Sequence, residues 1–285
     1  MTRPEVLTAV PTLFGTDGAI DPAETRRLHS ALREHVDGVF VAGTTGEFPA
    51  LTDSERLALF QLALAEWDAD AVVAHVGSPA TSQAVALAGA AVALGVRRLA
   101  VLPPYYFAVD AGDLIAHFTA VVEAAGDAEV YAYLFPDRTG VDLSPAVLAE
   151  LTRVTGLAGA KLSGRAAGRF AEYLDVLPPA ASAWSGADVE MVSVAVAGGR
   201  GLVSGMSAAD PAAFAALATA IETGDPTAVG VASERVHALA TALQGSPAGI
   251  KAGLHAQGYR STGSRMHQGA DGRVDPAAVV ALFPS

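Results

Sequence analysis

The sequence predicts an α/β protein, a (β/α)8 TIM barrel with a C-terminal helical extension. Three observations support this fold class. Short apolar runs alternate with amphipathic helical stretches eight times within residues 1–224. Many of the helical stretches begin with a capping residue beside a proline. The length of 285 residues fits one barrel, which typically takes roughly 250 residues, with additional helices.

Each predicted strand is apolar and is closed by glycine, proline or polar residues, as buried parallel strands tend to be. The eight strands are expected at residues 7–13, 38–43, 71–77, 97–103, 129–135, 157–162, 181–186 and 201–205. An open, doubly wound sheet is the alternative, but the eight units and the lack of a glycine-rich dinucleotide loop favour a closed barrel. Three helical segments follow, so we expect a catalytic barrel at residues 1–224 and a helical extension at residues 225–285.

Capping residues mark where the helices begin. Asp21 precedes Pro22, and Glu24 is placed to complete a capping box with Asp21. Thr52 and Glu55 predict a second capping box. Further Ser-Pro and Asp-Pro pairs predict helix N-termini at Ser78, Ser144, Asp210, Asp225, Ser246 and Asp275.

The composition excludes several kinds of partner and site. The net charge is −12 and the pI is near 4.9, so nucleic acid is not an expected partner, because an acidic chain repels phosphates. The chain has no cysteine, which excludes disulfides, thiolate metal ligands and thiol nucleophiles. Its seven histidines show no metal-ligand spacing. We therefore expect no metal site.

Residues 71–96 carry no Asp, Glu, Lys or Arg and need to be considered as a membrane span. His75, Ser78 and Pro79 interrupt this stretch, which favours a strand, a turn and an alanine-rich helix instead. No long apolar stretch follows Arg3 at the N-terminus, so no signal peptide is expected. The sequence thus predicts a cytoplasmic protein without a membrane segment.

The chain has 16 arginines but two lysines, so the two lysines are of particular interest. An amine that must lose its proton cannot be supplied by arginine, whose pKa lies above about 12. Lys161 ends the sixth predicted strand among Gly, Ala and Leu, where loss of solvation lowers an amine's pKa and allows attack on a ketone. A snorkelling or ion-paired lysine is the alternative. Lys251 lies in a predicted helix and is expected to be a surface or packing lysine.

Other polar residues lie where predicted strands end, and these ends meet at one rim of such a barrel. Thr44 and Thr45 can present backbone N–H groups and hydroxyls to a carboxylate, or simply form a capping loop. Tyr133 is a candidate proton shuttle or a packing residue. Arg138 could clamp a carboxylate or extend into solvent. His75 is expected to be a core or wall residue.

Several motifs together resemble the dihydrodipicolinate synthase and N-acetylneuraminate lyase family of class I pyruvate-dependent aldolases. They are GTTGE (43–47), PPYYF (103–107), YLFPDRTG (133–140), GAKLSG (159–164), WSGAD (184–188) and SPAGIK (246–251). The resemblance covers nearly the whole chain. It is carried by the order and spacing of the motifs, since none of them is specific alone.

The resemblance implies roles for four catalytic residues. Lys161 would form an imine with the keto carbon of pyruvate, and Tyr133 would move protons to and from the reacting carbon. Thr45 would link Tyr133 to Tyr106 in a hydroxyl relay, with Tyr106 reaching in from a neighbouring subunit. A homodimer or homotetramer that needs no cofactor is therefore expected.

The resemblance also implies a substrate-binding set. Thr44 and Thr45 would hold the pyruvate carboxylate, and the backbones of Gly186 and Val203 would line the pocket. Arg138 matches the arginine with which synthases of the family bind the carboxylate of the second substrate.

Three departures from the synthase pattern bear on the second substrate. Leu134 replaces the usual asparagine, Ala187 replaces a common acidic residue, and GEFPAL (46–51) is more like the sugar-acid aldolases. The leading hypothesis is a dihydrodipicolinate synthase-like lyase that condenses pyruvate with aspartate semialdehyde. A 2-keto-3-deoxy sugar-acid aldolase or related pyruvate lyase is the alternative, and a catalytically idle barrel that acts as a binding protein is a third possibility.

Overall fold

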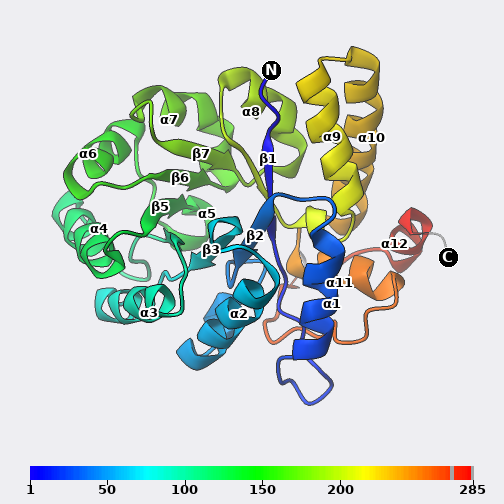
Figure 1. Ribbon diagram of the computed structural model, residues 1–285, viewed down its shortest axis with the longest axis horizontal. Helices are drawn as coiled ribbons and strands as arrows, with labels where there is room; N and C mark the ends of the chain where they lie inside the picture. The colour runs from blue at the N-terminus through cyan, green and yellow to red at the C-terminus, as the bar shows by residue number, and fades with distance from the viewer. Residues whose placement is uncertain (270–272, 284–285) are drawn as a thin grey trace.

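The computed structural model describes residues 1–269 and 273–283, and within them eight parallel strands form a closed barrel surrounded by helices (Figure 1). The strands pair in chain order, and β8 closes the ring by pairing with β1. They are β1 Glu5–Ala9, β2 Gly38–Val41, β3 Val72–His75, β4 Arg98–Val101, β5 Glu129–Leu134, β6 Gly159–Leu162, β7 Ser182–Ser185 and β8 Gly201–Ser204. The predicted (β/α)8 TIM barrel is confirmed.

Helices connect the strands and cover the outside of the barrel (Figure 1). They are α1 Pro22–Leu32, α2 Asp53–Glu66, α3 Thr81–Ala93, α4 Ala111–Ala125, α6 Pro145–Thr155, α7 Phe170–Val176, α8 Met191–Ala197 and α9 Pro211–Thr223. The short helix α5, Pro136–Thr139, follows β5 directly. In the described parts of the chain, no helix combines the length and apolar character needed to cross a membrane.

The C-terminal extension contains α10 Pro226–Leu243, α11 Pro247–Ala256 and α12 Pro276–Leu282. Gly224 adopts the left-handed conformation that ends α9, and the Asp225 side chain caps α10. Helix α10 packs against α9, and α12 packs against α10 and α11. The division of the chain into two domains at this point stays a prediction.

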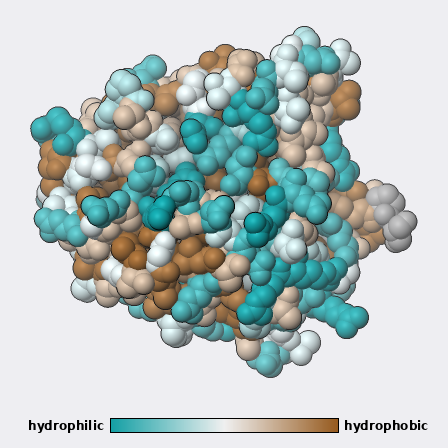
Figure 2. All heavy atoms as spheres, in the orientation of Figure 1, coloured by the Kyte–Doolittle hydropathy of each residue, from teal (hydrophilic) through white to brown (hydrophobic). Residues whose placement is uncertain are grey.

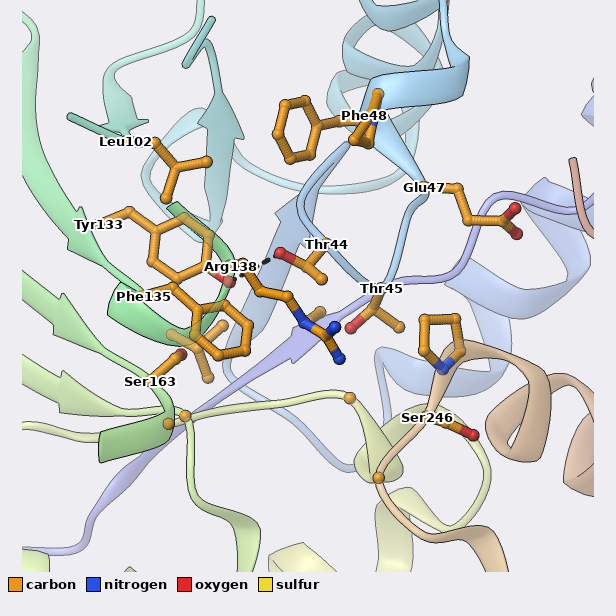
Figure 3. A pocket seen from close by; sticks show the side chains of 18 of the residues that line it. Thr44, Thr45, Glu47, Phe48, Leu102, Tyr133, Phe135, Arg138, Ser163 and Ser246 are labelled. Carbon is orange, nitrogen blue, oxygen red and sulfur yellow. Dashed lines mark hydrogen bonds between the residues drawn. The ribbon is translucent and has the colours of Figure 1, made fainter. Parts of the chain in front are cut away.

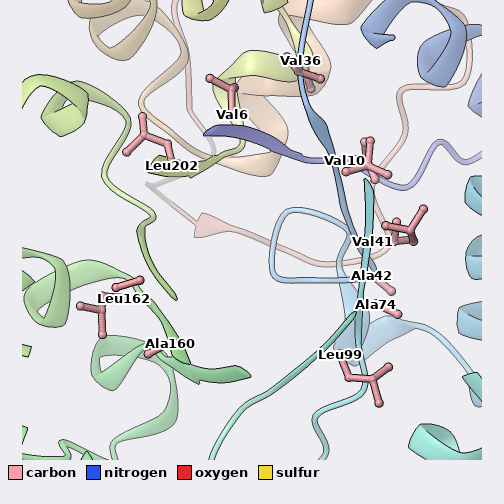
Figure 4. Close-up of a cluster of buried hydrophobic side chains, with 14 of the residues drawn as sticks. Val6, Val10, Val36, Val41, Ala42, Ala74, Leu99, Ala160, Leu162 and Leu202 are labelled. Atoms are coloured by element: carbon pink, nitrogen blue, oxygen red, sulfur yellow. The ribbon is translucent and has the colours of Figure 1, made fainter. Parts of the chain in front are cut away.

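Two layers of apolar side chains form the core, one inside the barrel and one between the strands and the helices. The outer layer includes Ala160 and Leu162 of β6 (Figure 4). Because side chains alternate along a strand, Lys161 between them points into the barrel. Tyr133 of β5 belongs to the inner layer in the same way, while its neighbour Leu134 lies in the outer layer. On the face shown in Figure 2, hydrophobic residues gather near α2 and α3 among hydrophilic side chains.

Two local predictions at the start of the chain are wrong. Strand β1 spans Glu5–Ala9 and not residues 7–13, since Pro11 has no N–H with which to continue the ladder. Asp21 caps α1 as expected, but Glu24 does not complete a capping box. The Glu24 carboxylate accepts instead from the backbone N–H of Arg260, at 2.9 Å, in the C-terminal extension. The Glu24 carboxylate is therefore used by a segment distant in the sequence and not by the N-terminus of its own helix.

The predicted helix start at Ser78 is also wrong, because α3 begins at Thr81 with Ala80 as its N-cap residue. The Ser78 hydroxyl accepts from the Ala80 N–H and donates to the Gln83 side chain, 2.6 Å away, so it stabilises the preceding turn. The second capping box, between Thr52 and Glu55, is confirmed. The other five predicted capping residues before prolines each accept a hydrogen bond from the first turn of their helix.

Candidate active site

The candidate active site is a cavity of about 630 Å³ at the C-terminal ends of the strands (Figure 3). Its inner part is lined by Lys161, Tyr133 and the Thr44–Thr45 turn. All of these were candidate site residues from the sequence. Its outer part is lined by residues 244–247 and 266–268 of the C-terminal extension. These outer residues could not be assigned to a site from the sequence, because nothing local in them indicates which strands they cover.

Lys161 lies inside the barrel near the end of β6 and is 5% exposed. Its Nζ atom lies 4.1 Å from the ring centroid of Phe40 and 4.1 Å from that of Tyr133. Burial lowers the pKa of Lys161 to about 7, and the negative charge of Asp188 acts in the opposite direction. A substantial fraction of the amine is therefore neutral near pH 7 and able to act as a nucleophile.

Tyr133 is the neighbour of Lys161 on the adjacent strand β5, in direct register. A hydrogen bond of 3.0 Å joins its hydroxyl to Thr44 Oγ1 (Figure 3). The assignment of this contact to Thr45 is corrected, since the Thr45 side chain faces Gly205 at the end of β8. Consecutive residues of the turn point in different directions, and the sequence does not show which one meets the phenol.

The electrostatics around Tyr133 favour a protonated phenol that can donate to a substrate. Burial raises the pKa of Tyr133, while hydrogen bonds with Thr44 and Ser163 and the charge of Arg138 act in the opposite direction. Ser163 also lines the cavity and was not assigned from the sequence, although it lies within the GAKLSG motif. A Cβ atom at Gly186 would lie 2.2 Å from Ser163 Oγ, so a side chain there would displace this serine.

The Gly-Thr-Thr-Gly-Glu turn is held in shape by its own backbone. Glu47 N donates to Thr44 O at 3.0 Å, and Glu47 adopts the left-handed conformation with φ of 56°. Thr12 Oγ1 also donates to Gly46 O at 2.6 Å. The turn therefore presents Thr44 and Thr45 at the cavity in a fixed position.

Glu47 and Lys251 form a buried ion pair that joins this turn to the C-terminal extension. Lys251 Nζ lies 2.5 Å from Glu47 Oε1 and donates to Gly263 O at 2.6 Å. The other carboxylate oxygen of Glu47 accepts from the backbone N–H groups of Arg265 and Met266, both at 2.9 Å. Lys251 is thus a packing lysine and not a surface lysine, and it fixes the segment that carries the outer lining of the cavity.

Four further sequence candidates lie in different places. Arg138, on α5, lines the cavity (Figure 3), and so does Val203 of β8. Tyr106 does not line the cavity of its own chain and is 86% exposed, with a positive φ of 88°. His75 is fully buried and its Nδ1 lies 2.9 Å from Ala42 O, so it is a core residue.

Comparisons with known proteins show which family and fold the chain resembles. A model of the Dihydrodipicolinate synthetase family matches residues 3–266. The 4-hydroxy-tetrahydrodipicolinate synthase of Moorella thermoacetica is 33% identical over 222 residues, which cover 77% of this chain and 76% of the relative. The dihydrodipicolinate synthase of Cyanidioschyzon merolae, solved with lysine bound, has a TM-score of 0.87 at 26% identity and covers 98% of this chain and 96% of that one. The sialic acid aldolase of Ruminococcus gnavus shares the fold, with a TM-score of 0.88 at 22% identity over 98% of this chain and 95% of that one.

Proposed function

The chain belongs to the dihydrodipicolinate synthetase family of lyases, and we propose that it is a pyruvate-dependent class I aldolase that forms its Schiff base on Lys161. The observation that carries this proposal is the pairing of a buried, partly neutral lysine with a buried phenol on the adjacent strand. The favoured reaction is the condensation of pyruvate with aspartate semialdehyde, as in the 4-hydroxy-tetrahydrodipicolinate synthases that the chain resembles.

The first step is imine formation. The neutral Lys161 amine attacks the keto carbon of pyruvate, one proton is taken up, and the carbonyl oxygen leaves as water. The nitrogen then carries a positive charge and can accept the electron pair of the C3–H bond. The low pKa of Lys161 allows this attack near neutral pH.

The second step is proton transfer at C3. Removal of one C3 proton converts the iminium to a neutral enamine, which attacks the aldehyde carbon while the aldehyde oxygen gains a proton. Tyr133 would carry these protons, and its hydrogen bond with Thr44 supports this role. Addition of water to the iminium then releases the product and restores the amine.

Carboxylate binding is assigned to the turn and its neighbours. Thr44 and Thr45 would hold the pyruvate carboxylate through hydroxyl and backbone N–H groups, and Gly186 and Val203 would line the site by their backbones. Tyr106 would complete the relay from a second copy of the chain, in keeping with its exposure on its own copy. A homodimer or homotetramer in the cytoplasm is part of the same proposal.

The second substrate is assigned through Arg138. Its planar guanidinium group suits the carboxylate of aspartate semialdehyde, and it lines the cavity from α5, the short helix that follows the reacting strand. The substitution at Leu134 has little bearing on this substrate, because its side chain packs in the outer core layer. Ala187 likewise is not among the lining residues.

A sugar-acid aldolase is the second candidate, and one observation favours it. Hydroxyl and amide groups of the extension, at Gln244, Ser246 and Gln268, line the outer cavity and suit a polyhydroxy aldehyde. Comparison of Arg138→Ala with the parent enzyme distinguishes the two. If Arg138 binds a carboxylate, aspartate semialdehyde loses about 2–4 kcal/mol of transition-state binding and glyceraldehyde changes little. A parent enzyme that uses glyceraldehyde and ignores aspartate semialdehyde would establish the sugar-acid aldolase instead.

Reductive trapping tests the Schiff base itself. Pyruvate with borohydride should add one reduced adduct to Lys161, located by peptide mass spectrometry, and Lys161→Ala should abolish it. Lys251 provides the internal comparison, because its amine is held in an ion pair. An adduct on Lys251, or none in active protein, would contradict the mechanism. Absence of both adduct and activity would support a barrel that only binds.

A further inference from the structure

Two carboxylates, Glu47 and Asp188, are found among the described residues that line the cavity. Both oxygens of Glu47 are engaged, one by Lys251 and the other by two backbone N–H groups. Asp188 is therefore the carboxylate that remains to act on the reacting centre, and the mechanism above gives it no task.

The position of the Asp188 side chain is fixed by a hydrogen bond from β8. It follows the end of β7, the strand beside β6, and its Oδ1 atom accepts a hydrogen bond from the hydroxyl of Ser204 on β8. Ser204 is itself fully buried, and its Oγ accepts from the backbone N–H of Ser207 at 2.9 Å. The Ser207 hydroxyl in turn lies 2.8 Å from Thr8 Oγ1 on β1. These hydrogen bonds hold the carboxylate at the cavity that Lys161 also lines.

The other described groups around Lys161 offer no countercharge. Two aromatic rings flank Nζ, and Tyr133 is protonated because burial raises its pKa. His75 is neutral, since burial lowers its pKa well below the usual value, and Arg138 carries a positive charge. Within residues 1–269 and 273–283, Asp188 is the charged group whose field raises the pKa of Lys161.

We propose that Asp188 is the counter-ion of the iminium that forms on Lys161, a positioned carboxylate that stabilises the positive nitrogen in a buried site. The inference rests on the proposed Schiff-base function. The neutral amine becomes a cation when the protonated imine forms, and a cation removed from water needs a nearby negative charge or dipole. The faces of the Phe40 and Tyr133 rings contribute in the same direction.

The pH dependence of this contribution has a definite sign. Burial raises the pKa of Asp188 to about 6, and the hydrogen bond from Ser204 acts against that rise. The carboxylate is therefore charged above about pH 6 and loses its charge as the pH falls through that value. Above pH 7 the Lys161 amine is mostly neutral, so the iminium gains the full effect of Asp188 relative to the free amine.

The test is Asp188→Asn, which keeps the shape and the acceptor for Ser204 but removes the charge. At pH 8 we expect the pyruvate concentration for half-maximal imine to rise about tenfold or more, measured as reduced adduct by intact-protein mass spectrometry, since one pKa unit corresponds to a factor of ten. Below about pH 6 the variant and the parent should converge, because Asp188 is then protonated in the parent as well. Asp142→Asn, an exposed carboxylate paired with Arg165, is the matched control and should behave as the parent.

Ser204→Ala provides an independent test that leaves the carboxylate in place. Loss of the Ser204 hydrogen bond should raise the pKa of Asp188. The pH below which Ser204→Ala and Asp188→Asn need the same pyruvate concentration for half-maximal imine should therefore be higher than for the parent and Asp188→Asn. The inference would be overturned if Asp188→Asn and the parent needed the same pyruvate concentration for half-maximal imine at pH 8. It would also be overturned if the difference between them were as large at pH 5.5 as at pH 8. Failure of the parent to trap pyruvate would instead overturn the proposed function.

Discussion

Removal of one partner of the Glu47–Lys251 ion pair should be far more damaging than removal of both. In Lys251→Met, the Glu47 carboxylate keeps its two backbone donors but loses its countercharge. The side chains are 2% and 1% exposed, so water does not replace the missing ammonium group. In the double variant Glu47→Gln, Lys251→Met, no charge remains buried at this position, and the glutamine oxygen can still accept from a backbone N–H.

The expected magnitudes follow from this difference. An unpaired buried charge costs about 3–5 kcal/mol, which is the predicted loss in the free energy of unfolding for Lys251→Met. A neutral pair of similar shape should cost about 1–2 kcal/mol, the usual cost of hydrogen bonds lost in a buried site. The double variant should therefore be more stable than the single one by about 1–4 kcal/mol.

Urea unfolding at one protein concentration, followed by tryptophan fluorescence, measures both values. Glu150 and Arg153 on α6 form an exposed ion pair, and Glu150→Gln, Arg153→Met serves as the surface control with no measurable change expected. A double variant as unstable as Lys251→Met would show that lost packing, and not the unpaired charge, is responsible.

Three further predictions concern activity and assembly. Tyr133→Phe should keep the pyruvate adduct on Lys161 while turnover falls by about 10²- to 10⁴-fold, and an unchanged turnover number would place the proton transfer elsewhere. Sedimentation should show a dimer or tetramer, because Tyr106 is exposed on its own chain, and a fully active monomer would contradict this. Lysine should inhibit weakly or not at all, since Phe48 is apolar and the Arg56 guanidinium is buried, donating to Gly77 O and His75 O. Half-inhibition at micromolar lysine in a steady-state assay would refute that reasoning.

Much of the fold could be predicted because its signals are local. Each strand is a short apolar run with its own stop signal, and alternation along β5 and β6 already directs Tyr133 and Lys161 to the same side of their strands. The capping residues before prolines fixed most helix starts for the same reason. The predictions for Ser78 and Glu24 were wrong because each side chain forms a hydrogen bond with a different partner. Ser78 bonds to the nearby Gln83 side chain, and Glu24 bonds to the distant backbone of Arg260.

The candidate site was less complete in the sequence than the fold. The residues of the Gly-Thr-Thr-Gly-Glu turn were identified, but the contact to Tyr133 was assigned to the wrong threonine. Asp188 was not identified as a site residue, because the family pattern has its acidic residue at position 187, one position earlier. The sequence also does not show that Ser204 orients the Asp188 carboxylate. The burial and charge of Asp188 depend on neighbouring residues at the ends of β7 and β8.

The sequence by itself determined the barrel, the place of Lys161 at the end of a buried strand and the family to which the chain belongs. These follow from patterns of a few residues, whose physical causes act along the chain. The tertiary structure alone decided that Lys251 is buried, since its partner Glu47 lies 204 positions away. It also decided that Asp188 lies with Lys161 in one cavity. A charge is stabilised or neutralised by what surrounds it in space, and that surrounding is built from segments that no local pattern connects.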